Sequence, residues 1–100
     1  MRPAFARTLV DLADADDRVW LVVGDVGFGV VETFARRFPE RYLNVGVAEA
    51  NLAGVSAGLA LAGARPFMYS IGNFPTLRCL EQIRNDICYN HVAVVIVCVG

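Results

Sequence analysis

The chain has 100 residues, of which 56% are hydrophobic and 19% charged, and its net charge is −1. This length is enough for one small domain, residues 1–100. A nucleic-acid-binding surface needs a basic excess, which the composition excludes. The longest purely apolar run, residues 92–99, is too short to cross a bilayer, so we expect neither a membrane span nor a signal peptide. The three cysteines form no C-x-x-C pair, and we expect reduced thiols in a cytoplasmic protein.

Helix and strand patterns alternate along the chain. Periodic apolar positions predict helices, and short continuous apolar runs predict buried parallel strands. In chain order the pattern predicts a helix over residues 3–15, a strand over 19–23, a helix over 30–37, a strand over 42–45, a helix over 48–62, a strand over 65–70, a helix over 75–89 and a strand over 92–99. We expect the last strand to be fully buried, with Cys98 in the core. We expect the last helix to carry one apolar face made of Leu77, Leu80, Ile83 and Ile87.

This alternation predicts an α/β fold with an open, mostly parallel sheet and helices on both faces. Ligands of such sheets lie beyond the carboxyl ends of the strands, which here are followed by residues 24–27, 46–49 and 70–74. The most apolar strand comes last, and no later segment of the chain covers its side of the sheet. We therefore expect a sheet that is incomplete at the C-terminal end and is completed by further polypeptide or by a partner.

Glu49 is the only ionisable side chain between Val45 and Gly63, and it lies at one of these strand ends. An unpaired carboxylate is costly to bury, so it must reach water, find a hydrogen-bond donor or hold a proton. One interpretation is an acidic residue in the first turn of a helix, where the helix dipole favours negative charge. The other interpretation is a catalytic carboxyl in a ligand site.

The other strand ends carry further candidate residues. Asp25 lies in a loop whose G-x-x-G-x-G spacing differs from the dinucleotide-binding fingerprint, and it either caps the loop or faces a ligand. Phe74 follows Gly72 and Asn73, and its ring either joins the core or stacks on a heteroaromatic ligand. His91 has no nucleophile or acid at a suitable spacing, so we interpret it as structural. No spacing of His, Cys and Asp predicts a metal site.

Three stretches of the sequence together resemble the transketolase-like enzymes. Residues 46–51 and 57–60 are similar to the G-[IV]-A-E-[QA]-N and A-G-L-A parts of that family's signature. Residues 72–78 resemble its S-T-F-L-T-R-R loop. Residues 81–89, Glu-Gln-Ile-Arg-Asn-Asp-Ile-Cys-Tyr, are very similar to a helix of transketolases that are divided between two polypeptides. By this resemblance the chain is identified as the N-terminal portion of a thiamine-diphosphate pyrimidine-binding domain.

The resemblance implies a role for each candidate residue. The glutamate that matches Glu49 hydrogen-bonds ring nitrogen 1′ of the aminopyrimidine of thiamine diphosphate, and so promotes loss of the proton at carbon 2 of the thiazolium. Phe74 matches the aromatic residue that stacks on the pyrimidine. We place Asp25 and Asn73 beside the cofactor. Leu77 replaces an arginine of the family loop, so the polar contact of that arginine is not expected here.

The activity implied by the resemblance is transfer of a two-carbon ketol unit between sugars, with thiamine diphosphate and Mg²⁺ as cofactors. The sequence lacks the pyrophosphate domain and its Gly-Asp-Gly metal motif, so a partner domain, and not this chain, would bind Mg²⁺. We therefore expect activity only with a pyrophosphate-binding subunit, in a dimer of heterodimers. We expect neither a nucleic acid nor a membrane as a partner.

Two other interpretations stay open at this point. One is a relative that uses the same domain in another reaction, either a deoxyxylulose-phosphate synthase or a 2-oxo-acid dehydrogenase β-subunit. Residues 81–89 favour a transketolase over both. The other interpretation is a truncated, non-catalytic domain that only binds or assembles with other chains, which the apolar composition favours.

Overall fold

Four parallel strands form the central sheet in the computed structural model, which describes residues 1–100. In spatial order the strands are β2 (Tyr42–Asn44), β1 (Val19–Val23), β3 (Arg65–Ile71) and β4 (Val95–Val99). Each neighbouring pair is parallel, with Leu21 opposite both Tyr42 and Phe67, and Phe67 opposite Val95. The prediction of an open parallel sheet is confirmed.

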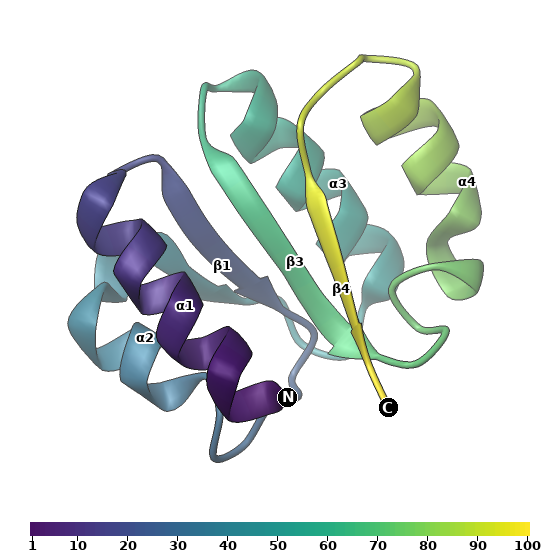
Figure 1. Cartoon of the computed structure of the whole chain (residues 1–100). Helices are drawn as coiled ribbons and strands as arrows, with labels where there is room; N and C mark the ends of the chain where they lie inside the picture. The colour runs from purple at the N-terminus through teal and green to yellow at the C-terminus, as the bar shows by residue number, and fades with distance from the viewer.

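Helices cover both faces of this sheet, as predicted (Figure 1). α1 (Arg2–Ala15) and α2 (Glu32–Arg37) lie on one face, and α3 (Glu49–Leu61) lies on the other. Successive side chains of a strand point to opposite faces, so Leu21 packs in the core cluster under α1 and α2 while Val22 packs in the cluster under α3. Because both faces of β1 are buried, the strand is a continuous apolar run and not an alternating one.

The helix predicted over residues 75–89 consists of three shorter segments. They are a 3₁₀ turn η2 (Leu77–Cys79), a single α-helical turn α4 (Leu80–Gln82) and a π-helical segment η3 (Ile83–Cys88). Their hydrogen bonds span three, four and five residues in turn, so a constant 3.6-residue spacing does not hold. The predicted apolar face is therefore wrong in part: Ile87 is buried, but Leu77 and Leu80 are 68% and 57% exposed.

The last strand corrects a second prediction. β4 begins at Val95 instead of residue 92, and it is not fully buried. It lies at the edge of the sheet and pairs only with β3, so its other side has no neighbouring strand in this chain. As a result Val95 and Cys98 are exposed, and the prediction that Cys98 belongs to the core is wrong.

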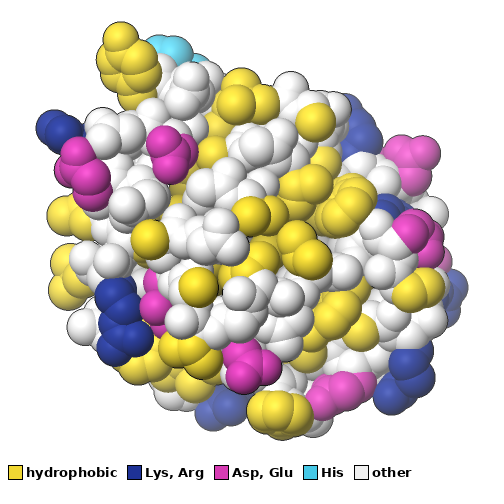
Figure 2. Space-filling model, turned by 180° about the vertical axis from the view of Figure 1, so that it is seen from behind, with side chains coloured by type: hydrophobic (Ala, Val, Ile, Leu, Met, Phe, Trp, Pro, Cys, Tyr) yellow, Lys and Arg dark blue, Asp and Glu magenta, His cyan; other side chains and the backbone are white.

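Large hydrophobic side chains are also exposed away from this edge. On the side opposite to the view of Figure 1, hydrophobic side chains form a broken band across the middle of the surface, and charged side chains lie mostly around it (Figure 2). The most exposed large hydrophobic residues besides Met1 are Phe28, Val47, Leu61, Leu77 and Tyr89. None of the helices combines the length and the hydrophobicity that a membrane span requires.

Candidate functional site

The loops that follow β1 and β2 are joined by one side chain, Asn44. Its Oδ1 accepts hydrogen bonds from the backbone N–H groups of Asp25 at 3.1 Å and Gly46 at 2.9 Å. Its Nδ2 donates to Oδ1 of Asp25 at 3.0 Å. The backbone of Asp25 has a φ of +56°, a left-handed conformation that Asp tolerates better than most residues. The carboxylate of Asp25 therefore helps to fasten two strand ends together, which supports the capping interpretation.

Glu49 is the first residue of α3 and is only 5% exposed. No side chain caps this helix, so the carboxyl lies at an end where backbone N–H groups favour negative charge. The predicted place in the first turn is thus confirmed. The helix dipole accounts for the position but not for the burial. The one hydrogen-bond donor to the carboxylate is Arg78, whose Nη1 lies 3.5 Å from Oε1.

Phe74 lies in the loop between β3 and η2, and its ring belongs to neither core cluster. Its backbone N–H donates to the carbonyl of Ile71 at 3.0 Å, and the Cys79 thiol donates to its carbonyl at 3.6 Å. These hydrogen bonds fix the conformation of the loop. Because the ring belongs to neither core cluster, the interpretation of Phe74 as a core residue is wrong. The guanidinium of Arg78 lies over the ring face, with its Cζ 3.8 Å from the ring centroid.

Arg78 brings Glu49 and Phe74 together, because its guanidinium contacts both side chains. Sequence reasoning included Arg78 only as the last residue of the loop over residues 72–78 and did not single it out as a site residue. The available signal was a single basic residue four positions after the loop aromatic. Cys79 follows Arg78 in the chain, and burial raises the pKa of its thiol, which the negative charge of Glu49 raises further.

Asn73 shapes the same loop through its backbone. Its carbonyl oxygen accepts hydrogen bonds from the Thr76 hydroxyl and from the backbone N–H groups of Thr76 and Arg78, each at 3.3 Å. Its side-chain amide is exposed and makes no hydrogen bond within the chain. The amide is therefore free to bind a ligand.

The strand ends and α3 converge at Gly24. A Cβ atom built on this glycine would lie 3.5 Å from the Ser70 hydroxyl, 3.5 Å from Leu52 and 3.6 Å from the Gly46 carbonyl. The Ser70 hydroxyl is buried and has no hydrogen-bond partner. Gly24, Gly46 and Ser70, which lie at or just after the ends of β1, β2 and β3, thus meet α3 at one tightly packed junction. His91 lies outside it, in the turn before β4, where its backbone N–H donates to the carbonyl of Cys88 at 3.1 Å.

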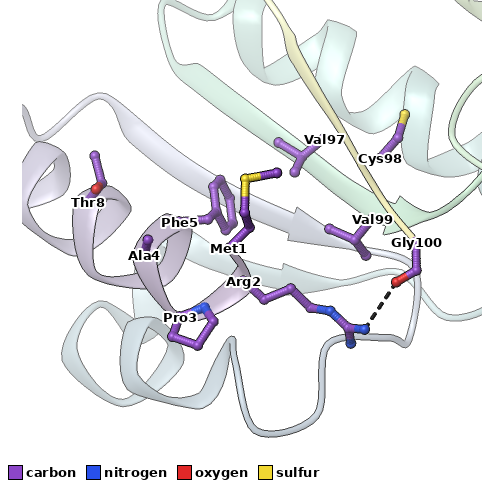
Figure 3. A pocket seen from close by; sticks show the side chains of 10 residues that line it. All are labelled: Met1, Arg2, Pro3, Ala4, Phe5, Thr8, Val97, Cys98, Val99 and Gly100. Carbon is purple, nitrogen blue, oxygen red and sulfur yellow. Dashed lines mark hydrogen bonds between the residues drawn. The ribbon is translucent and has the colours of Figure 1, made fainter.

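The largest hollow of the molecule lies elsewhere, between the start of α1 and β4 (Figure 3). Its volume is about 670 Å³, and Phe5, Val97 and Val99 give it an apolar wall. Arg2 closes one end by donating a hydrogen bond from its Nη2 to the carbonyl of Gly100 at 3.0 Å. The hollow contains none of the candidate residues and follows from the uncovered edge of β4. Nowhere in the chain do three or more His, Cys, Asp or Glu side chains gather in a way that could hold a metal ion.

An open parallel sheet with a buried carboxyl and an aromatic ring outside the core at the carboxyl ends of its strands is typical of a ligand-binding α/β domain. The family model described as "Transketolase, pyrimidine binding domain" matches residues 1–100. The chain belongs to this family. The resemblance of its motifs to transketolase-like enzymes is thereby confirmed.

Individual relatives agree with this assignment. The chain is 38% identical over 99 residues to a "Putative transketolase C-terminal section" of Methanocaldococcus jannaschii, covering 97% of this chain and 31% of that protein. It is 38% identical over 92 residues to a "1-deoxy-D-xylulose-5-phosphate synthase" of Desulforudis audaxviator, covering 91% of this chain and 14% of that protein. A solved structure described as "Split gene transketolase, inactive beta4 tetramer" has a TM-score of 0.85 and 38% identity, over 95% of this chain and 32% of that chain. The chain thus spans about a third or less of these relatives.

Proposed function

We propose that this chain is the pyrimidine-binding part of a divided transketolase, which transfers a two-carbon ketol unit between a ketose and an aldose. Thiamine diphosphate would be the cofactor. The observation that carries the proposal is the placement of Glu49 and Phe74 at the ligand edge of the sheet. A buried carboxylate and an aromatic ring face both contact one planar group there, the guanidinium of Arg78.

The residues at this edge fit an aminopyrimidine ring. The guanidinium of Arg78 lies 3.5 Å from the Glu49 carboxylate and 3.8 Å from the centre of the Phe74 ring. A planar nitrogen-containing group therefore has both a hydrogen-bonding carboxyl and a stacking surface at this place. When bound, thiamine diphosphate supplies a thiazolium carbon that carries the carbanion chemistry, while the protein supplies binding and orientation.

Glu49 is the proposed catalytic residue. Its carboxyl would hydrogen-bond ring nitrogen 1′ of the aminopyrimidine and hold a proton at that atom. Leu52 and Ala53 follow it by three and four residues on the same face of α3, and both are fully buried. Glu49 itself is only 5% exposed, so its carboxyl is largely shielded from water, which strengthens its hydrogen bond. Phe74 stacks on the ring and fixes its orientation.

Two neighbouring loops supply further proposed contacts to the cofactor. Asp25 is held in place by Asn44, and its carboxylate stays exposed at the strand edge. Asn73 presents a free amide two positions after the end of β3. Both side chains are polar groups on loops that a rigid sheet positions, which is the usual origin of ligand contacts in such folds.

The proposed second half of the site belongs to a pyrophosphate-binding subunit, which holds the diphosphate and Mg²⁺. Two such pairs would form a dimer of heterodimers in the cytoplasm and act on small sugar substrates. The support for a divided enzyme is that one relative is described as a C-terminal section and another as a split-gene transketolase.

A reconstitution assay tests this function. The chain is mixed with a pyrophosphate-domain subunit, thiamine diphosphate, Mg²⁺, a ketose donor and an aldose acceptor, and the product sugar is measured. Transfer should require both polypeptides and should be lost with Glu49→Gln. Glu81→Gln, which changes an exposed acid of α4, should keep it. An assembled pair of subunits without transfer would contradict the proposal and favour a non-catalytic domain.

A second candidate function is that of a deoxyxylulose-phosphate synthase. The identity of the chain to the Desulforudis audaxviator enzyme is as high as its identity to the transketolase C-terminal section, at 38%. The same reconstituted pair decides between the two. Release of carbon dioxide from a 2-oxo acid donor would select the synthase, or a 2-oxo-acid dehydrogenase relative, over a transketolase.

A further inference from the structure

The guanidinium group of Arg78 occupies the place assigned to the pyrimidine ring. Its Nη1 lies 3.5 Å from Oε1 of Glu49, and its Cζ lies 3.8 Å from the centroid of the Phe74 ring. One planar, nitrogen-rich group thus stacks on the aromatic face and faces the carboxylate at the same time. An aminopyrimidine would make the same two kinds of contact, so the ring and the guanidinium compete for one place.

The two partners of this ion pair are unequally buried. The Glu49 side chain is 6% exposed, whereas the Arg78 side chain is 52% exposed. A buried carboxylate that loses its only partner is strongly destabilised. A half-exposed arginine loses little when it moves into water. Arg78 therefore keeps the buried carboxylate paired, and it is the partner that can move away once another group takes over the pairing.

The backbone does not have to change for this movement. Arg78 lies in the 3₁₀ turn η2, and its backbone N–H is bonded to the carbonyl of Asn73 at 3.3 Å. The next residue, Cys79, is fully buried and anchors the turn. Rotation about the side-chain bonds of Arg78 is enough to clear the face of the Phe74 ring.

We propose that Arg78 is a built-in competitor of the cofactor ring, whose side chain rotates away from Glu49 and Phe74 when the pyrimidine binds. The inference rests on the proposed function, since it requires a pyrimidine ring to bind between these two residues. The inference also defines which ligands can bind: only a planar group that both stacks on the ring and hydrogen-bonds to the carboxyl replaces both contacts of the guanidinium.

Titration of the full chain with thiamine, followed by NMR, tests this competition. Arg78→Ala should bind thiamine about 3- to 30-fold more tightly than the natural chain, because the ring no longer displaces a cation–π contact and an ion pair. Arg84→Ala is the matched control, since it removes another arginine of the same region, paired with Glu81 at 3.1 Å. It should leave the dissociation constant unchanged. Equal or weaker binding by Arg78→Ala overturns the proposal. Removal of an arginine that does not compete would leave binding equal, and removal of an arginine that binds the cofactor would weaken it.

Two further variants separate this inference from the proposed function. Arg78→Met keeps the aliphatic part of the side chain but removes the charge. It should also bind thiamine more tightly than the natural chain, even if Arg78→Ala disturbs the turn η2. Glu49→Gln should weaken thiamine binding. If removal of the Arg78 charge has no effect while Glu49→Gln weakens binding, the competition is wrong and the pyrimidine site stands. If thiamine binds to all variants equally, both the competition and the proposed site are wrong.

Discussion

At the scale of single residues, Glu49 owes its position to two local causes. The amino end of α3 favours a negative charge, and Arg78 supplies the only donor to the carboxylate. The sequence was sufficient to single out Glu49, because no other ionisable group occurs between Val45 and Gly63. It was not sufficient to find Arg78, whose contact depends on how the loop after β3 folds back toward α3.

The glycine-rich loop after β1 allows a test at the same scale. Gly27 has a φ of +100°, and a Cβ atom there would lie 2.8 Å from Cγ1 of Val31 and 3.1 Å from the Tyr69 ring. Gly29 has a φ of +77° with no atom within 4 Å of such a Cβ. Gly29→Ala should lower the free energy of unfolding by ~1–2 kcal/mol through backbone strain alone. Gly27→Ala should lower it by a further ~1–3 kcal/mol through overpacking.

Urea denaturation of the two variants measures these values side by side. A matched pair of this kind separates the backbone effect from the packing effect, because both glycines lie in left-handed conformations. Equal losses in the two variants would mean that the loop relaxes around the added methyl group.

At the scale of elements, the alternation of apolar periods predicted every strand and the order of the helices. The ends and the burial of the last two elements, residues 75–89 and β4, were harder to predict. Residues 75–89 have the apolar spacing of a helix, but the hydrogen bonding changes from 3₁₀ to α to π along them. The apolar run before and within β4 indicated burial, which its place at the sheet edge prevents. Both errors come from tertiary context that local spacing does not contain.

The junction between α1 and β1 gives a prediction about pH. Asp16 caps the C-terminal end of α1 and accepts two hydrogen bonds from the Arg18 side chain, each at 2.9 Å. These bonds lower the pKa of the Asp16 carboxyl from 3.8 to about 2. A lowered pKa in the folded state means that the contribution to stability is present above pH 3.8 and is lost as the pH falls toward 2.

An NMR titration of the Asp16 carboxyl measures this shift. The midpoint should lie near pH 2 in the natural chain and return toward 3.8 in Arg18→Met. Arg36→Met, an exposed arginine of α2, should leave the midpoint where it was. A low midpoint that persists in Arg18→Met would show that another group holds the carboxylate.

At the scale of the whole molecule, the chain matches one domain of its longer relatives. Its fold and family could be predicted from sequence, because three motifs and the alternation of elements agree with each other and with the structure. Its activity could not be predicted in the same way. The chain spans about a third or less of its relatives, and these include both a transketolase section and a deoxyxylulose-phosphate synthase.

The central claim is that Glu49 activates the cofactor through the pyrimidine ring. The most direct measurement is the exchange of the carbon 2 proton of thiamine diphosphate in heavy water, followed by NMR with the chain assembled with its pyrophosphate-domain partner. Glu49→Gln should slow this exchange about 100-fold or more while leaving the fold intact. Glu81→Gln, the control, should not change it. An unchanged exchange rate in Glu49→Gln would contradict the catalytic role of this carboxyl.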